Sequence, residues 1–335
     1  MANLGYIQIA RRCNQKCVFC SNPANGLVLT FDQAVAYVDD FVARGYHGII
    51  LTGGEPTLFE PLEELIHYAR ERGMPSRMIT NGQKTARADY LARLVEAGLT
   101  HLHLSIHSWR EDVHDYLTQT PGSLKKQRMS LENVEKLGIT ADVNCVINKH
   151  NADHLHENVR WIVEHFPFVS HFVWNNLDPL LNQEMNLDDV LPKLRDFEVS
   201  LMKAMRWLDL QGRTFRVERV PLCAMAEYAH CSTETRKIVK QEERTVHFLD
   251  QKQTVRQTEW RHDKGEACKV CRFNPICAGL YQMNVYYDER ELSPVFLDPQ
   301  EVIDRIRADQ ASNPDEPQRR LAAGQCGPDP GREPA

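Results

Sequence analysis

The sequence of 335 residues has no run of about 18 uninterrupted apolar residues, the length that a membrane-spanning helix requires. It also lacks a secretory signal, because its N-terminus, MANLGYIQIARRC, has no charged segment followed by an apolar segment and a cleavage site. These two absences predict a cytoplasmic protein that does not bind membranes. The net charge is only −6, with both signs interspersed, which argues against a broad surface for nucleic acid.

Two sequence patterns are also missing, and their absence narrows the fold. No strand candidate is followed by a complete G-x-G-x-x-G motif, which disfavours a dinucleotide-binding fold. No repeat with the period of a solenoid is present. The apolar fraction of 42% suffices for a substantial core, so the chain can form one large α/β barrel or two ordinary domains.

Cysteine, in contrast, is abundant, with ten residues in a chain that shows no sign of secretion. In a reducing compartment, clustered cysteines are more often metal or redox ligands than disulfide partners. The groups are Cys13, Cys17 and Cys20; Cys223 and Cys231; and Cys268, Cys271 and Cys277, while Cys145 and Cys326 stand alone. This grouping, more than the number of cysteines, predicts metal binding.

Short β-rich runs alternate with helical stretches up to about residue 220. The strand candidates are LGYIQIA, HGIILTGG, PSRMITNG, THLHLSIH, TADVNCVIN and SHFVWNNL. The helix candidates are Phe31–Arg44, Pro61–Arg72, Ala86–Ala97, Leu124–Leu137, Ala152–His165 and Asp188–Trp207. Six β-then-α units predict a parallel sheet with right-handed crossovers. Strands with apolar centres and polar ends, such as IILTGGE, favour a partial (β/α)6 TIM-like barrel with its chemistry at the strand C-termini.

The composition changes after the barrel. Residues 221–305 are rich in cysteines and aromatic residues and contain a short hairpin pattern, so we interpret them as a small cysteine-rich extension nucleated by metal. Residues 306–335 are rich in proline, glycine and charge, which predicts a disordered tail. We therefore expect a barrel over residues 1–220, followed by the extension and the tail. Cys326 lies in the tail and is expected to be incidental.

The first cysteine group lies in RCNQKCVFC, a C-x3-C-x2-C loop directly after the first strand candidate. Thiolates in such a loop suit zinc or an iron–sulfur cluster. A structural zinc site needs four ligands and would have to borrow a distant one. A four-iron cluster held by three thiolates would instead leave one iron open to bind and reduce a substrate.

This loop resembles that of the radical S-adenosylmethionine (SAM) superfamily. In that superfamily, the open iron of a [4Fe–4S] cluster chelates SAM, and one electron cleaves SAM to methionine and a 5′-deoxyadenosyl radical. The resemblance implies that Cys13, Cys17 and Cys20 bind the cluster. It also implies that Phe19, just before the third cysteine, lies near the adenine.

The second strand candidate ends in Gly53-Gly54-Glu55-Pro56, which resembles the GGEP motif of the superfamily. The resemblance implies that the backbone of Gly53 and Gly54 and the acid of Glu55 meet the amino group of SAM. Glycines allow a backbone to approach a ligand closely, and a carboxylate at a strand end can pair with an ammonium group. The alternative for this motif alone is a Gly-Gly turn with an N-capping acid.

Three later residues add weaker matches. Asn81, in Thr80-Asn81-Gly82, resembles the TNG motif of the MoaA/PqqE/SPASM-like branch of the superfamily. Ser105 lies where that branch has a polar contact to SAM, and Asn144 matches the region that lines the ribose and the methionyl carboxylate. Each of these residues could also be a turn residue at a strand end.

His101, His103 and His107 alternate along one strand face, as metal ligands could. We interpret them as barrel-lining or surface histidines, because no acidic partner pattern accompanies them.

The last cysteine group, Cys268, Cys271 and Cys277, has a C-x2-C-x5-C spacing. It resembles the SPASM and shorter twitch extensions that hold auxiliary [4Fe–4S] clusters, and the resemblance adds Cys223 as the fourth ligand of one such cluster. A full SPASM domain has further cysteines, which ICAGLYQMNVYY does not supply, so a second auxiliary cluster is not expected. A zinc ribbon is the alternative, and Cys231 could replace Cys223, stay free or contact substrate.

The resemblance implies an enzyme that reductively cleaves SAM and abstracts hydrogen from a peptide or small-molecule substrate in a maturation or biosynthetic reaction. The auxiliary cluster would assist electron transfer, and an external donor such as flavodoxin or ferredoxin would supply electrons. The residues identify no catalytic acid or base, and we expect any module that binds a leader peptide to be a separate protein. The alternative class is a non-catalytic iron–sulfur electron carrier or a zinc-stabilised binding protein.

Overall fold

The computed structural model describes residues 4–180 and 186–312. The strands are β1 (Leu4–Ala10), β2 (Gly48–Gly53), β3 (Ser76–Thr80), β4 (Leu99–Ser105), β5 (Thr140–Ile147), β6 (His171–Asn176), β7 (Thr214–Glu218), β8 (Arg244–His247) and β9 (Thr254–Gln257). The α-helices are α1 (Phe31–Ala43), α2 (Leu62–Glu71), α3 (Ala88–Ala97), α4 (Glu111–Thr118), α5 (Ser123–Leu137), α6 (Leu155–His165), α7 (Leu187–Val190), α8 (Leu194–Leu210), α9 (Thr233–Lys240) and α10 (Pro299–Ser312). The short 3₁₀ helices are η1 (Pro56–Leu58), η2 (Ala152–His154), η3 (Leu222–Ala224), η4 (Ala226–Cys231), η5 (Glu266–Lys269) and η6 (Glu289–Glu291).

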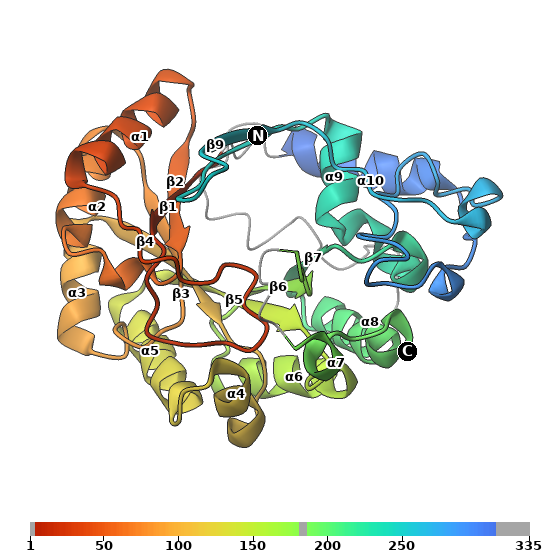
Figure 1. Ribbon diagram of the computed structural model, residues 1–335, viewed down its shortest axis with the longest axis horizontal. Coiled ribbons are helices and arrows are strands. Elements are labelled where there is room, and N and C mark those ends of the chain that lie inside the picture. The colour runs from red at the N-terminus through yellow and green to blue at the C-terminus, as the bar shows by residue number, and fades with distance from the viewer. Residues whose placement is uncertain (1–3, 181–185, 313–335) are drawn as a thin grey trace.

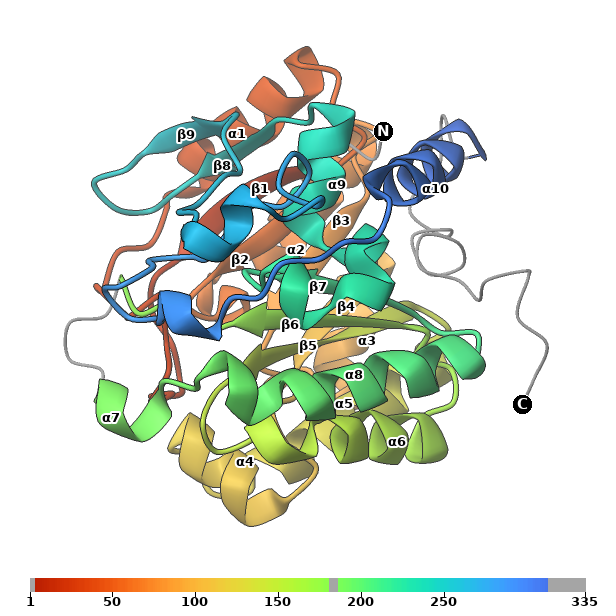
Figure 2. The same cartoon turned by 90° about the vertical axis from the view of Figure 1, so that its right-hand side faces the viewer.

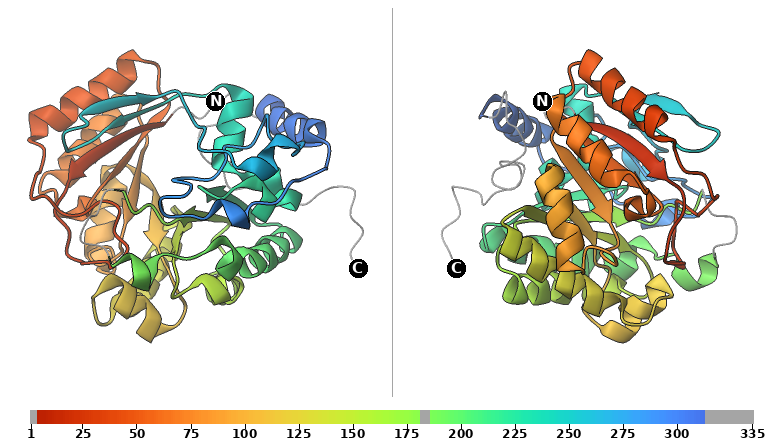
Figure 3. Two further views of the ribbon diagram at one scale, coloured as in Figure 1. Left: turned by 45° about the vertical axis from the view of Figure 1, so that its right-hand side comes forward. Right: turned by 90° about the vertical axis from the view of Figure 1, so that its left-hand side faces the viewer.

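One curved sheet with the strand order β7-β6-β5-β4-β3-β2-β1-β8-β9 forms the centre of the protein. The strands from β1 to β7 are parallel to their neighbours, and helices cover the outer face of the sheet (Figures 1 and 3). Side chains that point outward, such as those of Ile7, Leu51 and Leu104, are fully buried under these helices. The sheet does not close on itself, so the predicted α/β partial barrel and all six predicted strands are confirmed.

The predicted hairpin in the extension is the pair β8–β9, but it joins the barrel sheet instead of forming part of a separate appendage. β8 pairs with β1 in parallel, and β9 pairs with β8 in antiparallel. This pairing satisfies backbone groups at the β1 edge that would otherwise be open. The segments after β7 then pack against the open side of the barrel, with α9 between β7 and the hairpin (Figures 1 and 2).

The β8–β9 hairpin also contacts the loop that follows β1. Arg11 Nη1 lies 3.1 Å from Asp250 Oδ2 in the hairpin turn, and both side chains are largely buried. The side chain of Asn25 donates to the carbonyl of Leu249 at 3.1 Å, and the backbone N–H of Leu249 donates to Gln8 Oε1 at 3.1 Å. The C-terminal half of the chain thereby fixes the loop that carries the first three cysteines.

Two predicted elements differ from the structure. The helix predicted over Asp188–Trp207 is two helices, α7 and α8, because Pro192 lies between them and a proline cannot continue a helix. Residues 306–312, which the sequence assigns to the tail, are the last part of α10. The rest of the predicted tail, residues 313–335 with Cys326, lies outside the described residues. No helix within the described ranges has the length and apolar character needed to cross a membrane.

Candidate functional site

A pocket of about 510 Å³ lies at the carboxyl ends of β1 to β5, where parallel barrels carry their chemistry. The loop after β1 forms one wall, and the strand ends form the other. Of the predicted site residues, those that line the pocket are Cys13, Cys17, Cys20, Phe19, Gly53, Gly54, Asn81, Ser105 and Asn144. The structure therefore brings together residues that are spread over more than 130 positions of the sequence, from 13 to 144.

The three cysteines lie on a loop that is tied down on both sides. Val18 N donates to Leu117 O of α4 at 2.9 Å, and Arg11 N donates to Leu27 O at 2.8 Å. N–H groups also face two of the sulfurs: Gln15 N lies 3.5 Å from Cys13 Sγ and Asn22 N lies 3.4 Å from Cys20 Sγ. Burial raises the pKa of Cys13 to about 11 and raises that of Cys17 as well. Burial therefore favours the neutral form of these two thiols while no cation is bound.

Gly53 and Gly54 allow the end of β2 to dock on this loop. A Cβ atom on Gly53 would lie 2.1 Å from the carbonyl oxygen of Ala10, and one on Gly54 would lie 2.4 Å from that of Arg12. Gly53 also has φ +136°, a backbone conformation that favours glycine. In place of side chains, Gly54 N donates to Ala10 O at 2.7 Å, so the glycines position Cys13 beside the strand end.

Glu55 directly follows Gly54 and is held by hydrogen bonds from its neighbours. Its side chain is 0% exposed and does not line the pocket. Oε1 accepts hydrogen bonds from Thr57 N, Thr57 Oγ1 and Thr80 Oγ1 at 3.0, 2.7 and 2.8 Å, and Oε2 accepts one from Asn81 N at 2.8 Å. The carboxylate thus joins β2 to the end of β3, and its expected contact with the ammonium group of SAM stays a prediction.

We expect Glu55→Gln to destabilise the iron-free protein by about 1–3 kcal/mol, the cost of an unsatisfied buried polar group. The amide NH₂ would face donors where the carboxylate accepts four hydrogen bonds. Burial raises the pKa of Glu55, and the four hydrogen bonds oppose this increase. The substitution therefore also tests whether the carboxyl group of Glu55 is ionised or protonated. Urea unfolding measures the change, with the exposed Glu60→Gln as the control. Equal stability of the two variants would contradict an ionised Glu55.

The other predicted cofactor residues are held by neighbours outside the pocket lining. Asn81 Nδ2 donates to Asn14 Oδ1 at 2.7 Å and lies 3.8 Å from Cys13 Sγ. Asn144 Oδ1 accepts from Asn175 Nδ2 at 2.6 Å, and the backbone carbonyl of Ser105 accepts from Gln127 Nε2 at 2.7 Å. These bonds fix polar groups of β3, β4 and β5 at the pocket wall.

His107 is a pocket residue that the sequence analysis leaves out of the site. It lines the same pocket, and its ring lies edge-on to that of Phe19 with 4.5 Å between the ring centroids. The signal that could have found it is its spacing, because His107 is two residues beyond Ser105 and therefore continues the same face of β4.

His101 and His103 do have an acidic partner, contrary to the expectation from the sequence. Asp142 stands opposite His103 on β5, and its Oδ2 lies 2.8 Å from His101 Nε2 and 3.2 Å from His103 Nδ1. Although burial raises it, His101 and hydrogen bonds from both imidazoles hold the pKa of Asp142 well below its usual range. Burial lowers the pKa of His103 to about 4, so this imidazole is neutral at physiological pH, and we interpret the group as a buried polar cluster near Arg77 inside the barrel.

The four cysteines assigned to the extension also come together. Cys223 lies on η3 directly after β7, Cys268 lies on η5, and all four, Cys223, Cys268, Cys271 and Cys277, line a second small cavity. Backbone N–H groups of Val295 and Gly279 donate to Cys271 Sγ and Cys277 Sγ, both at 3.3 Å. Cys231 is fully buried on η4 and is not among the residues that line this cavity, so it does not replace Cys223.

The spacing of the sulfur atoms distinguishes two kinds of metal site. A single zinc ion with Zn–S distances of about 2.3 Å would hold its sulfurs about 3.8 Å apart. Within the described part of the chain, His101, His103 and Asp142 are the one group of three or more potential ligands whose donor atoms all lie within 4.8 Å of one another. In each cysteine group, at least two sulfur atoms therefore lie more than 4.8 Å apart, which is farther than a single zinc ion would hold them.

The fold and the pocket define an α/β protein with an open parallel barrel and three thiols at its mouth. Residues 7–162 match the model of the Radical SAM superfamily. The chain therefore contains a radical SAM domain, and the resemblance seen in the cysteine loop is confirmed.

Two curated relatives match part of the chain. The Fe-coproporphyrin III synthase of Methanosarcina barkeri is 34% identical over 148 residues, which cover 43% of this chain and 37% of the relative. The PqqA peptide cyclase of Xanthomonas campestris pv. campestris is 30% identical over 151 residues, which cover 44% and 40% of the two chains. The matched part thus spans about two fifths of each relative.

Solved structures with low sequence identity share the fold. SuiB of Streptococcus suis bound to the precursor peptide SuiA has a TM-score of 0.61 at 14% identity, over 84% of this chain and 72% of that chain. Native anSMEcpe with bound AdoMet has a TM-score of 0.62 at 16% identity, over 92% of this chain and 98% of that chain. The second likeness extends the shared fold beyond the barrel into the C-terminal region.

Proposed function

We propose that this protein is a radical SAM enzyme that cleaves SAM reductively and abstracts hydrogen from a peptide substrate in a maturation reaction. The observation that carries the proposal is the 510 Å³ pocket, in which three cysteines face the ends of four further strands. A size of about 300–1,000 Å³ is usual for sites that bind small molecules and cofactors.

The residues present fit a [4Fe–4S] cluster at the first cysteine group. Cys13, Cys17 and Cys20 would each bind a different iron, which agrees with sulfur atoms that stand too far apart for a single ion. When bound, the cluster supplies the one electron that splits SAM into methionine and a 5′-deoxyadenosyl radical. The tied loop would hold the three thiolates and keep other ligands away from the fourth iron.

The strand ends would bind and orient SAM. Because Glu55 is committed to four hydrogen bonds, we assign the ammonium group of SAM to the backbone and hydroxyl oxygens around Thr52 and Gly53 at the end of β2. Asn81, Ser105 and Asn144 offer polar groups for the carboxylate and the ribose. Phe19 and Val146 offer apolar surface for the adenine.

We assign one auxiliary [4Fe–4S] cluster to Cys223, Cys268, Cys271 and Cys277. The four thiols around one cavity would complete its coordination, which favours electron transfer over substrate binding as its role. An external donor such as flavodoxin or ferredoxin would supply electrons. A zinc ribbon is less consistent with the wide spacing of these sulfurs.

Relatives support two classes of substrate. The PqqA peptide cyclase and the peptide-bound SuiB structure are named for peptides, and we favour a peptide for this reason. A small-molecule substrate is the second candidate, because the relative that is 34% identical is named for an iron porphyrin. A non-catalytic electron carrier would not need a large pocket beside its cysteines.

Anaerobic reconstitution with iron and sulfide, followed by dithionite and SAM, tests the proposal. We expect 5′-deoxyadenosine to form, as measured by liquid chromatography, and to be absent when dithionite is omitted. A reconstituted protein that contains iron but forms no 5′-deoxyadenosine would contradict the proposed SAM-cleaving activity. Zinc in place of iron in the purified protein would favour a binding protein.

A further inference from the structure

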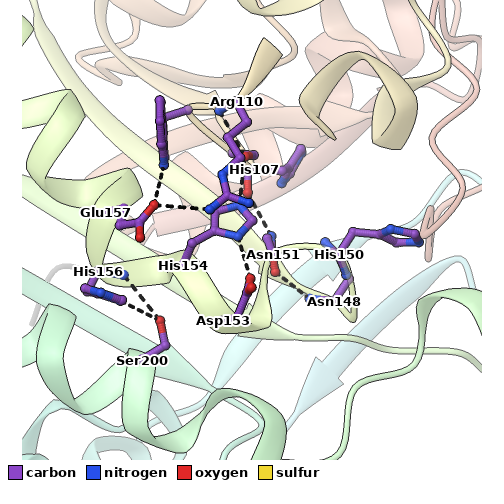
Figure 4. A network of polar contacts seen from close by, with 12 residues as sticks. His107, Arg110, Asn148, His150, Asn151, Asp153, His154, His156, Glu157 and Ser200 are labelled. Carbon is purple, nitrogen blue, oxygen red and sulfur yellow. Dashed lines mark hydrogen bonds and ion pairs between the residues drawn. The ribbon is translucent and has the colours of Figure 1, made fainter. Parts of the chain in front are cut away.

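His107 is held in place by β5 and by the segment that follows it, from which Asn151 contacts the backbone of His107 (Figure 4). Its Nδ1 accepts a hydrogen bond from the backbone N–H of Val146 at 3.2 Å. Its own backbone carbonyl accepts one from Asn151 Nδ2 at 2.8 Å, and Asn151 also donates to the carbonyl of Val146 at 2.9 Å. The backbone N–H of His107 donates to His114 Nδ1 at 3.3 Å. The bond from Val146 therefore fixes the ring, and the bonds with Asn151 and His114 fix the backbone of His107.

This arrangement determines which nitrogen carries the proton. A ring nitrogen that accepts a hydrogen bond has no hydrogen, so the neutral ring of His107 carries its hydrogen on Nε2. Burial, reinforced by the nearby His114, lowers the pKa of His107 well below its usual range. The imidazole is thus neutral at physiological pH, and Nε2–H is the polar group that it can offer to a ligand.

The surroundings of the ring indicate what that ligand group is. The ring lines the pocket beside Phe19, and Val146 and Ile79 line the same pocket. Such a wall suits a flat group with apolar faces and hydrogen-bond acceptors at its edge. In SAM, only the adenine has this character.

We propose that His107 donates a hydrogen bond from Nε2–H to a ring nitrogen of the adenine of SAM and so determines the specificity of the pocket for adenine. This inference rests on the proposed function, because it requires SAM in the pocket. His107 is a binding residue in this proposal and takes no part in proton transfer.

Two variants separate the loss of the Nε2–H donor from the loss of the hydrogen bond between Nδ1 and Val146 N–H. In His107→Asn, Oδ1 can still accept from Val146 N–H, but the Nε2 donor is lost. In His107→Gln, the side-chain amide restores a donor near the position of Nε2 without the Nδ1 acceptor. His150→Asn is the matched control, because this histidine lies outside the pocket lining and contacts Asp189 instead.

The experiment measures the Kd of SAM by calorimetry on the reconstituted protein without reductant, so that no turnover occurs. It also uses three analogues in which adenine N1, N3 or N7 is replaced by C–H. We expect one analogue to bind the wild-type protein about 3- to 10-fold more weakly than SAM, the usual value of one hydrogen bond. His107→Asn should bind SAM more weakly by the same factor and should bind SAM and that analogue with equal Kd. His107→Gln should recover part of the difference in Kd between SAM and the analogue.

The outcomes distinguish the inference from the function on which it rests. If the wild-type protein does not bind SAM, the proposed function fails and the inference with it. If it binds SAM but His107→Asn keeps the full preference against the analogue, the inference alone is wrong. Should the variants fail to fold, a long-range ¹⁵N–¹H spectrum of the wild-type protein provides a second test, since a proton on Nδ1 of His107 would overturn the proposal.

Discussion

Cys17→Ser is expected to abolish the formation of 5′-deoxyadenosine by the reconstituted protein. Three thiols are present at the pocket, one for each of three irons, so none can be spared if the fourth iron is to stay open. Among the described cysteines outside the two groups, Cys145 cannot replace Cys17, because it is buried on β5 and the loop around Cys17 is tied to α4 through the hydrogen bond from Val18 N to Leu117 O. A serine hydroxyl is a harder ligand with a higher pKa and does not replace a thiolate.

The measurement pairs product formation with iron content. We expect Cys17→Ser to lose about four iron atoms per chain, the content of one cluster. Cys145→Ser is the matched control, since it replaces a cysteine outside both groups and should keep the iron and the product. If Cys17→Ser formed 5′-deoxyadenosine at the wild-type rate, the assignment of the cluster to this loop would be wrong.

The double variant Cys268→Ser/Cys271→Ser is expected to lose the auxiliary cluster while it retains SAM cleavage. These two cysteines line the second cavity and not the SAM pocket, so about four iron atoms per chain should disappear and uncoupled formation of 5′-deoxyadenosine should persist. Substrate conversion should stop if the auxiliary cluster transfers electrons.

The same variant should also loosen the extension. After β9, the chain up to α10 contains only the short elements η5 and η6, so metal binding would supply much of its local stability. A loss of about 1.4 kcal/mol of local stability increases the population of open states, and with it the rate of proteolysis, about tenfold. Val270→Ser is the control, because this residue lies between the two cysteines and is 63% exposed. Unchanged iron content and proteolysis in the double variant would refute a cluster at this site.

The sequence predicts well those parts of the protein that depend on local pattern. All six predicted strands are present, since each has a short apolar run bounded by turn residues. Cys13, Cys17 and Cys20 are close in sequence, so their spacing alone indicates a common site. Cys223 lies 45 residues before Cys268, and only the resemblance to known extensions connects the two.

The contacts that the sequence did not reveal have a common physical origin in the packing of neighbouring strands. A carboxylate at a strand end can face a ligand or its neighbours, and the carboxylate of Glu55 accepts hydrogen bonds from Thr57, Thr80 and Asn81. The acidic partner of His103 is likewise on another strand, 39 residues away in sequence. Neither relation can be read from one strand alone, because it depends on the register of the sheet.

The pairing of the β8–β9 hairpin with β1 connects the two regions that carry the cysteine groups through one sheet. The turn of the hairpin contacts the first cysteine loop through Arg11 and Asp250, and the strand that follows leads into the second cysteine group. A displacement of the C-terminal half, for example by an arriving substrate, would therefore be transmitted to the N-terminal thiols. In a fragment that stops after β7, the edge of β1 would lack its partner strand β8, and the first cysteine loop would lack its contact with Asp250. We therefore expect that neither half folds independently.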